Sequence, residues 1–169
     1  MKTNIIICKT LVFIILFLSI MSKQNYSLLL ADDDDDDCAF FKDAIDELNF
    51  SIDLITAKDG VQLMNFLLDD LANNLPDILF LDLNMPKKSG YECLTEIKTI
   101  DKLKHLPVII FSTSLDLNIV DLMFEKGATY YIQKPGEFSK LKKVIENALT
   151  ISAENNFRQP VRDYFILQP

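Results

Sequence analysis

Five apolar runs of strand length recur along the chain, at residues 26–31, 52–57, 78–83, 108–113 and 129–133. Between and after these runs, apolar residues recur three or four positions apart, which is the spacing of one helix face. The five faces consist of Phe40, Phe41, Ala44, Ile45 and Leu48, then Val61, Met64, Leu67, Leu68 and Leu71, then Tyr91, Leu94 and Ile97, then Ile119, Val120, Met123 and Phe124, and finally Leu141, Val144, Ile145, Ala148 and Leu149. The pattern therefore predicts five strands, each followed by a helix.

Residues that start and end helices stand where this alternation requires them. Ser89 and Glu92 have the spacing of a capping box, in which each residue bonds a free backbone N–H of the first turn. Asp59 and Asp116 are placed as N-caps, and Gly127 is placed as a C-cap. These signals support the predicted helix boundaries independently of hydrophobicity.

Strands that alternate with helices form parallel sheets, because the helix carries the chain back to the same end of the sheet. The runs at 78–83 and 108–113, and the start of the run at 26–31, are nearly all apolar, as expected for strands with helices on both faces. The predicted fold class is therefore α/β, (βα)5, with a doubly wound, parallel, five-stranded sheet.

The length of 169 residues fits one domain with short extensions, and a hydrophobic content of 49% suffices for a core. We expect the domain to cover residues 21–150. Residues 151–169 are too short for a second domain, but their aromatic and aliphatic side chains suggest that they pack back onto the first one. No output domain is expected.

Residues 1–20 differ from the rest, with a basic start and an apolar run at 11–18. The run is short for a membrane span, and no small-residue cleavage site follows it. Met21 opens a stretch that resembles an ordinary cytosolic N-terminus. Three interpretations stay open: a non-native upstream start, which we favour, a membrane anchor, or an export signal.

The net charge of −8 argues against a nucleic-acid partner and favours a cation or a basic partner. Cys8, Cys38 and Cys93 are scattered, and His105 is the single histidine, so neither a zinc site nor a disulfide framework is expected. Cysteine usage of this kind favours a reducing, cytoplasmic compartment, and we expect no membrane partner.

Polar residues gather where the predicted strands end. Asp32 and Asp33 follow the first strand, Asp82 ends the third, Ser112 ends the fourth, and Lys134 follows the fifth. The carboxyl ends of parallel strands meet at one edge of the sheet, which is the functional edge of doubly wound folds. We therefore expect these five side chains to lie close together.

Three carboxylates in one pocket repel one another unless a cation neutralises them, and ligands that are all oxygen favour Mg²⁺, Mn²⁺ or Ca²⁺. A lysine and a hydroxyl beside a divalent ion suggest a bound phosphoryl group. Asp82, near the middle of the sheet, is the natural nucleophile for an acyl phosphate. The remaining aspartates of the run, at 35–37, are expected to begin the first helix, where carboxylates favour the helix dipole.

The stretches "LLLADD", "DILFLDLNMPKKSG", "VIIFSTS" and "GATYYIQKP" resemble the receiver domain of bacterial two-component response regulators, of the single-domain, chemotaxis-receiver-like type. The resemblance covers residues 26–150 and implies the flavodoxin-like strand order 2-1-3-4-5.

The resemblance also implies roles for individual residues. Asp82 matches the position of the phosphoacceptor in that family. By the same resemblance, Mg²⁺ (or Mn²⁺) would be bound by Asp33 directly, by Asp32 through water, by Asp82 and by the backbone carbonyl of Asn84. Ser112 and Lys134 match the groups that bind the phosphoryl oxygens. Tyr131 matches a switch aromatic, expected to turn toward the core when Asp82 carries a phosphoryl group.

Partners follow from the same resemblance. A histidine kinase or a histidine phosphotransfer protein would supply the phosphoryl group. A downstream protein would bind the surface formed by residues 119–126, 130–134 and 138–145.

Two other functions fit part of this pattern. The first is a pseudo-receiver that is never phosphorylated and serves as an interaction module, which the complete set of Asp82, Ser112 and Lys134 argues against. The second is a phosphohydrolase of the haloacid dehalogenase type, in which a second aspartate acts as general acid. Asn84 stands at that position here, so turnover hydrolysis is disfavoured and the chain is not expected to be an enzyme.

Overall fold

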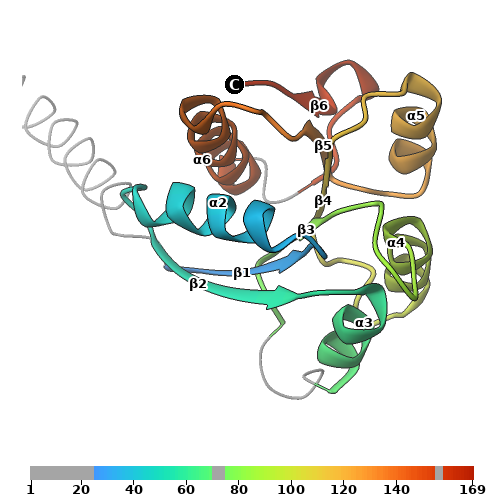
Figure 1. Cartoon of the computed structure of the whole chain (residues 1–169). Helices are drawn as coiled ribbons and strands as arrows, with labels where there is room; N and C mark the ends of the chain where they lie inside the picture. Colours follow the sequence, from blue (N-terminus) through green and yellow to red (C-terminus); the bar gives the residue numbers. More distant parts are fainter. Residues whose placement is uncertain (1–24, 70–74, 155–157) are drawn as a thin grey trace, which may run out of the picture.

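A computed structural model describes residues 25–69, 75–154 and 158–169, so the prediction for residues 1–20 lies outside the described residues. Six strands form one parallel sheet in the order β2-β1-β3-β4-β5-β6 (Figure 1). The strands are β1 (Asn25–Ala31), β2 (Ser51–Ala57), β3 (Ile78–Leu81), β4 (Val108–Ser112), β5 (Tyr130–Gln133) and β6 (Ile166–Leu167). The predicted order 2-1-3-4-5 is confirmed, and the sheet has a sixth strand that the prediction lacked.

Helices cover both faces of the sheet. They are α2 (Asp35–Asp46), α3 (Gly60–Asp69), α4 (Gly90–Thr99), α5 (Leu117–Glu125) and α6 (Phe138–Glu154), and a 3-10 helix, η2, covers Arg162–Tyr164. Figure 1 shows α2 and α6 on one face and α3, α4 and α5 on the other. Within the described part of the chain, no helix is long and apolar enough to cross a membrane.

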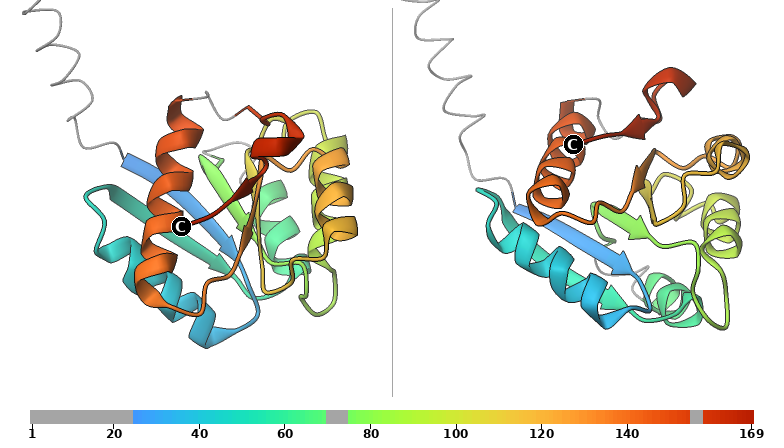
Figure 2. Two further views of the ribbon diagram at one scale, coloured as in Figure 1. Left: turned by 90° about the horizontal axis from the view of Figure 1, so that it is seen from above. Right: turned by 45° about the horizontal axis from the view of Figure 1, so that its top comes forward.

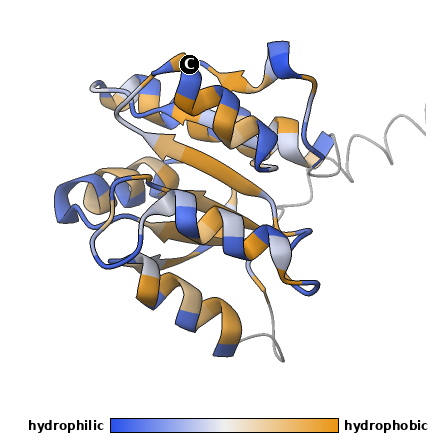
Figure 3. Ribbon diagram, turned by 90° about the vertical axis from the view of Figure 1, so that its right-hand side faces the viewer, coloured by the Kyte–Doolittle hydropathy of each residue, from blue (hydrophilic) through white to orange (hydrophobic). Residues whose placement is uncertain are grey.

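The core consists of two apolar layers separated by the sheet. Side chains alternate between the faces of each strand, so Leu28 and Leu30 pack toward α2 and α6, whereas Leu29 packs toward α3, α4 and α5. The inner strands β3 and β4 are buried along their whole length and almost entirely apolar, whereas the edge strand β2 carries polar residues such as Asp53. Polar residues also lie on the outer sides of the helices (Figure 3). Both layers use residues that the periodicity assigned to the core.

The predicted helix caps are present. Ser89 and Glu92 form a reciprocal capping box at the start of α4, and the Asp116 side chain accepts a hydrogen bond from Asn118 N at the start of α5. Asp59 Oδ1 accepts hydrogen bonds from the first backbone amides of α3. Gly127 follows α5 with a φ of 86°, a left-handed conformation that glycine adopts without steric cost.

The sixth strand comes from the C-terminal segment, residues 158–169. It returns to the sheet after α6, and β6 pairs in parallel with β5 (Figure 2). The expectation that the residues after 150 pack back onto the domain is thus met, and the segment's place is the edge of β5. The sheet has six strands rather than five because this short pairing is added.

Backbone hydrogen bonds hold the residues at the strand ends in place. Asp32 N donates to Ala57 O at 3.0 Å, and Asp82 N donates to Ala31 O at 2.9 Å. Lys134 N donates to Ser112 O at 2.8 Å. Each of these residues lies just past a strand, yet its backbone is still tied to the neighbouring strand, so its side chain projects from a rigid base.

One glycine lets α4 begin directly against the end of β3. A Cβ atom added at Gly90 would lie 2.1 Å from the backbone oxygen of Asp82, far inside van der Waals contact. Gly136, in contrast, has no atom within 4 Å of such a Cβ. A side chain at position 90 would therefore displace either α4 or the Asp82 backbone.

We expect Gly90→Ala to lower the free energy of unfolding by about 1–3 kcal/mol, the usual cost of overpacking. Gly136→Ala is the matched control and should stay within about 0.5 kcal/mol of the parent chain, as surface substitutions usually do. Urea unfolding followed by circular dichroism measures both values. Equal stabilities of the two variants would contradict the close approach at Gly90.

Candidate metal and phosphoacceptor site

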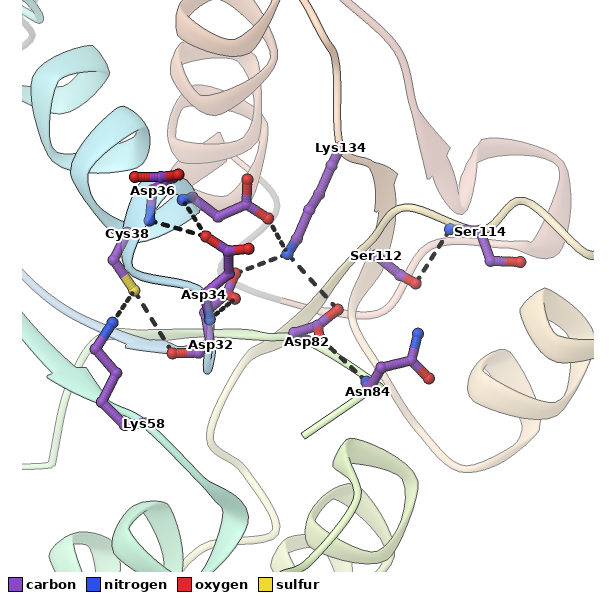
Figure 4. Close-up of polar contacts among 11 residues, drawn as sticks. Asp32, Asp34, Asp36, Cys38, Lys58, Asp82, Asn84, Ser112, Ser114 and Lys134 are labelled. Atoms are coloured by element: carbon purple, nitrogen blue, oxygen red, sulfur yellow. Dashed lines mark hydrogen bonds and ion pairs between the residues drawn. The ribbon is translucent and has the colours of Figure 1, made fainter. Parts of the chain in front are cut away.

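Side chains from three strand ends meet at the carboxyl edge of the sheet. Asp32 follows β1, Asp82 follows β3, and Lys134 follows β5, and Figure 4 shows the Lys134 ammonium pointing toward the two carboxylates. The site therefore forms where the sequence predicted it, because the parallel strands all end at this edge.

Three carboxylates converge in the site. One oxygen each from Asp32, Asp33 and Asp82 lies within 4.8 Å of the others. Asp32 and Asp82 are buried, with exposed fractions of 0% and 5%, whereas Asp33 is exposed. Such a cluster has two buried charges and one that faces solvent, which leaves an open side for an ion or a ligand.

Lys134 is the cation of the site. Its Nζ lies 2.8 Å from Asp32 Oδ2, 2.6 Å from Asp37 Oδ2 and 3.8 Å from Asp82 Oδ1. Burial alone would lower the pKa of Lys134, but its hydrogen bonds to Asp32 and Asp37 hold that pKa above its usual range. Lys134 therefore stays protonated, and it lies nearer to Asp32 and Asp37 than to Asp82.

Burial raises the pKa of both inner carboxyl groups. For Asp32, burial is the largest cause, and the contacts with Lys134 act in the opposite direction. For Asp82, burial is again the largest cause, Lys134 lowers the pKa, and the neighbouring Asp32 raises it. The single ammonium thus compensates only part of the cost of burying two carboxylates.

The consecutive aspartates at 32–37 differ in their contacts. Asp34 is the N-cap of α2, and its Oδ1 accepts hydrogen bonds from Asp36 N and Asp37 N, which lowers its pKa. Asp35 forms an ion pair with Lys58 at 2.5 Å. The predicted placement of residues 35–37 in the first turn of a helix is confirmed.

Two residues that form ion pairs at the site were not predicted from the sequence. Asp37 was assigned only to the helix start, although it contacts Lys134 from a position 97 residues earlier in the chain. Lys58, at the end of β2, lies beside Asp35 and also donates to Cys38 Sγ at 3.2 Å. Lys58 could have been found by applying the strand-end rule to β2 as well, but no local pattern signals Asp37.

Ser112 and Tyr131 occupy the side of the site nearest β4 and β5. Ser112 is fully buried, and its Oγ accepts a hydrogen bond from Ser114 N at 3.3 Å. The Tyr131 hydroxyl donates to Ser114 O at 2.7 Å. Tyr131 is fully buried in the core layer beneath α5, and the bond to Ser114 O directs its hydroxyl toward the loop between β4 and α5, which is the inward orientation.

Asn84 lies in the loop after β3, and its backbone N–H donates to Asp82 Oδ2 at 3.1 Å. This bond orients the Asp82 carboxylate. The role predicted for the Asn84 carbonyl, as an ion ligand, stays a prediction.

The arrangement has the parts needed to bind a divalent cation and a phosphoryl group at one carboxylate. Oxygen ligands cluster at the open side, a protonated lysine lies within reach, and a buried serine hydroxyl stands at the adjacent strand end. On this fold, such a site defines a class of small α/β signalling domains.

The family follows from comparison with known proteins. Residues 28–146 match the family model described as the response regulator receiver domain. The matched part exceeds half of the chain, so this chain belongs to the response regulator receiver family, and it is a receiver domain of two-component signalling.

Among curated relatives, Response regulator Rcp1 from Synechocystis sp. is 35% identical over 97 residues. That match covers 56% of this chain and 66% of Rcp1, which is just under two thirds of the relative.

Solved structures agree with the fold. The phosphorylated cyanobacterial phytochrome response regulator RcpA has a TM-score of 0.71 at 27% identity, and the alignment covers 78% of this chain and 96% of RcpA. The Mn²⁺-bound form of Rcp1 has a TM-score of 0.67 at 29% identity, covering 74% of this chain and 92% of that structure.

We expect Asp82→Asn to raise the free energy of unfolding at pH 7, without divalent ions, by about 1 kcal/mol, a typical single-site effect. The folded-state pKa of Asp82 lies above its unfolded value, so ionisation of this carboxyl costs stability once the pH rises past that unfolded value. This loss of stability increases with pH until the pH reaches the folded-state pKa of Asp82, and it is constant above that. The gain from Asp82→Asn should therefore shrink as the pH falls toward about 4, the ordinary aspartate pKa.

Urea unfolding in a chelator at several pH values measures this gain. Asp36→Asn removes an exposed carboxylate of the same run and is the control for net charge. An Asp82→Asn variant that is no more stable than the control at pH 7 would contradict the conclusion that the Asp82 charge is buried at a cost.

Proposed function

We propose that the chain is a phosphorylation-dependent switch in which Asp82 accepts a phosphoryl group from a histidine kinase or a histidine phosphotransfer protein. The observation that carries the proposal is the position of Asp82. It is a buried carboxylate at the end of the central strand β3, and it lies in one cluster with Asp32, Asp33 and Lys134.

The residues of the pocket fit a divalent cation, Mg²⁺ or Mn²⁺. Asp32, Asp33 and Asp82 would hold the ion together with the backbone carbonyl of Asn84, and the clustering of three carboxylate oxygens within 4.8 Å supports this set. When bound, the ion supplies positive charge that offsets the carboxylates and the phosphoryl oxygens. A similar solved structure, of Rcp1, is a Mn²⁺-bound form.

In the transfer, a carboxylate oxygen of Asp82 attacks the phosphorus of a phosphohistidine. The new P–O bond forms as the P–N bond breaks, and the electron pair of the broken bond goes to the imidazole. Asn84 N–H orients the attacking carboxylate. The Ser112 hydroxyl and the Lys134 ammonium are the groups available to donate hydrogen bonds to the phosphoryl oxygens.

In this scheme the Lys134 ammonium interacts with several carboxylates as well as with the phosphoryl group. It lies 2.6 Å from Asp37 and 2.8 Å from Asp32, but 3.8 Å from Asp82. A phosphoryl group on Asp82 adds negative charge next to Lys134 and draws the ammonium toward it. The chain itself is the phosphoryl carrier, so we propose no turnover enzyme.

The surface that a downstream protein would bind is formed by α5, β5 and α6, which correspond to residues 119–126, 130–134 and 138–145 of the prediction. Tyr131 lies in β5 and reaches Ser114, two residues after Ser112. These contacts support the proposal that a structural change at Asp82 reaches that surface. Among similar structures is a CheX–CheY complex with beryllofluoride and Mg²⁺ from Borrelia burgdorferi, at 28% identity and a TM-score of 0.62 over 75% of this chain and 88% of that one. We place the protein in the cytoplasm, with the kinases that would phosphorylate it.

We expect Mg²⁺ to raise the melting temperature by roughly 5 °C at about a hundredfold excess over its Kd, because a ligand that binds only the folded state stabilises it. Asp33→Ala should abolish most of this shift, whereas Asp36→Ala, an exposed position in the same aspartate run, should preserve it. Differential scanning calorimetry with and without Mg²⁺ measures the shift. Identical melting temperatures for the parent chain would contradict the metal site.

Incubation with acetyl phosphate and Mg²⁺ should add one phosphoryl group to the chain, and peptide mass spectrometry should map it to Asp82. Asp82→Asn should abolish the modification, while Asp36→Asn should leave it intact. Ser112→Ala should slow it, because one donor to the phosphoryl oxygens is lost. A chain that stays unmodified under these conditions would instead support an interaction module without phosphorylation.

A further inference from the structure

The C-terminal segment, residues 158–169, lies on the surface assigned to partners. Its strand β6 pairs with β5 through Tyr131 and Ile166 and through Ile132 and Leu167. Tyr131 N donates to Phe165 O at 2.9 Å. Without the segment, β5 would be the edge strand of the sheet, with unpaired N–H and C=O groups that accept an added strand.

An aromatic side chain anchors the segment. Phe165 is fully buried, and its ring centroid lies 5.2 Å from that of Phe124 in α5 and 6.4 Å from that of Tyr131 in β5. The preceding residue, Tyr164, is 73% exposed. One ring of the segment is therefore part of the core layer beneath α5, whereas its neighbour faces solvent.

Polar contacts hold the segment against α5. Gln159 Nε2 donates to Phe124 O at 2.7 Å, a carbonyl in the last turn of α5, and to Ala128 O at 2.8 Å in the loop that follows the helix. Arg162 Nε forms an ion pair with Asp121 Oδ1 at 2.6 Å. The contacts link the segment to α5 at both the end and the middle of the helix.

The segment also covers the switch residue. Tyr131 is fully buried beneath Phe165, and its hydroxyl donates to Ser114 O. Ser114 N in turn donates to Ser112 Oγ. Contacts thus run from Phe165 through Tyr131 and Ser114 to Ser112, at the edge of the Asp82 pocket. An outward turn of Tyr131 would bring its ring into the space that the segment occupies.

We propose that residues 158–169 are an intrinsic ligand of the α5–β5 surface, and that their docking is coupled to phosphoryl occupancy of Asp82 through the inward Tyr131. The coupling part rests on the proposed function, because it requires an acceptor at Asp82. In this proposal the docked segment favours the inward Tyr131, which is also the orientation expected when Asp82 carries a phosphoryl group. Coupling between two sites is reciprocal, so each event strengthens the other.

The test uses the full chain, with beryllofluoride and Mg²⁺ standing in for the acyl phosphate. Phe165→Ala removes the anchoring ring. Gln159→Glu replaces the side-chain amide, which donates hydrogen bonds to two backbone carbonyls, with a carboxylate that cannot donate. Because position 159 is exposed, this variant still tests the proposal if Phe165→Ala fails to fold. Tyr164→Ala is the matched control, because it removes an exposed aromatic ring from the same segment.

Two quantities are measured for each variant. Hydrogen exchange of the Tyr131 amide, which donates to Phe165 O, reports docking without any ligand. Titration with beryllofluoride reports the acceptor site. We expect Phe165→Ala and Gln159→Glu to speed the exchange and to weaken beryllofluoride binding by roughly fivefold, the lower end of typical allosteric coupling. Tyr164→Ala should match the parent chain in both.

The contrary outcomes separate the two proposals. Faster exchange with unchanged beryllofluoride affinity would overturn the coupling. Rapid exchange of the Tyr131 amide in the parent chain would overturn the docking itself. A parent chain that binds no beryllofluoride would overturn the acceptor function and the coupling, while the exchange data still decide the docking. Protection that appears only with dimerisation, seen by sedimentation at increasing concentration, would place the segment on a second copy and overturn docking within one chain.

Discussion

The central constraint on this structure is that several carboxylates lie together at one edge of the sheet, with a single ammonium group among them. Asp32 and Asp82 are buried, Asp33 and Asp37 flank them, and Lys134 contacts three of the four. Burying charges is costly unless they are paired, and one cation cannot pair fully with all of them. The raised pKa values of Asp32 and Asp82 are the signature of this deficit. A site in this condition gains from any added positive charge, which is why a divalent ion fits it.

The parallel sheet holds the buried carboxylates close together in spite of their repulsion. The backbone amides of Asp32, Asp82 and Lys134 are each hydrogen-bonded to the adjacent strand, so none of the three side chains can retreat far from the others. Two apolar layers fix the strands from both faces. The repulsion therefore stays concentrated at the strand ends, where the binding of a ligand relieves it. The ends of β4 and β5 are also joined, because Lys134 N donates to Ser112 O.

Much of this could be predicted from the sequence, because the governing rules are local. Apolar runs and helical spacing locate the strands, and the polar residues at the ends of the runs lie at the functional edge. This rule predicts the positions of Asp32, Asp82, Ser112 and Lys134. The contact between Asp37 and Lys134 depends on the rotation of α2 relative to β5, which no local pattern encodes.

The sixth strand was missed for a similar reason. β6 has two residues, too few for any periodicity, and its position depends on a buried Phe165 that resembles any other aromatic residue of the tail. Phe165 also contacts the ring of Tyr131, and this contact between distant parts of the chain likewise has no local signal in the sequence.

The run of six aspartates has a consequence for how the chain tolerates changes in length. Within this run Asp32 is a buried carboxylate of the site, Asp33 is an exposed one, Asp34 caps a helix, and Asp35 and Asp37 form ion pairs, yet all are the same residue. Insertion or loss of one aspartate would leave an aspartate at nearly every one of these positions. What it would change is the phase of α2, turned by about 100° per residue, so that Phe41 would leave the core. A one-residue change in the run would thus act mainly through the packing of α2 and through its last position, where Asp37 contacts Lys134.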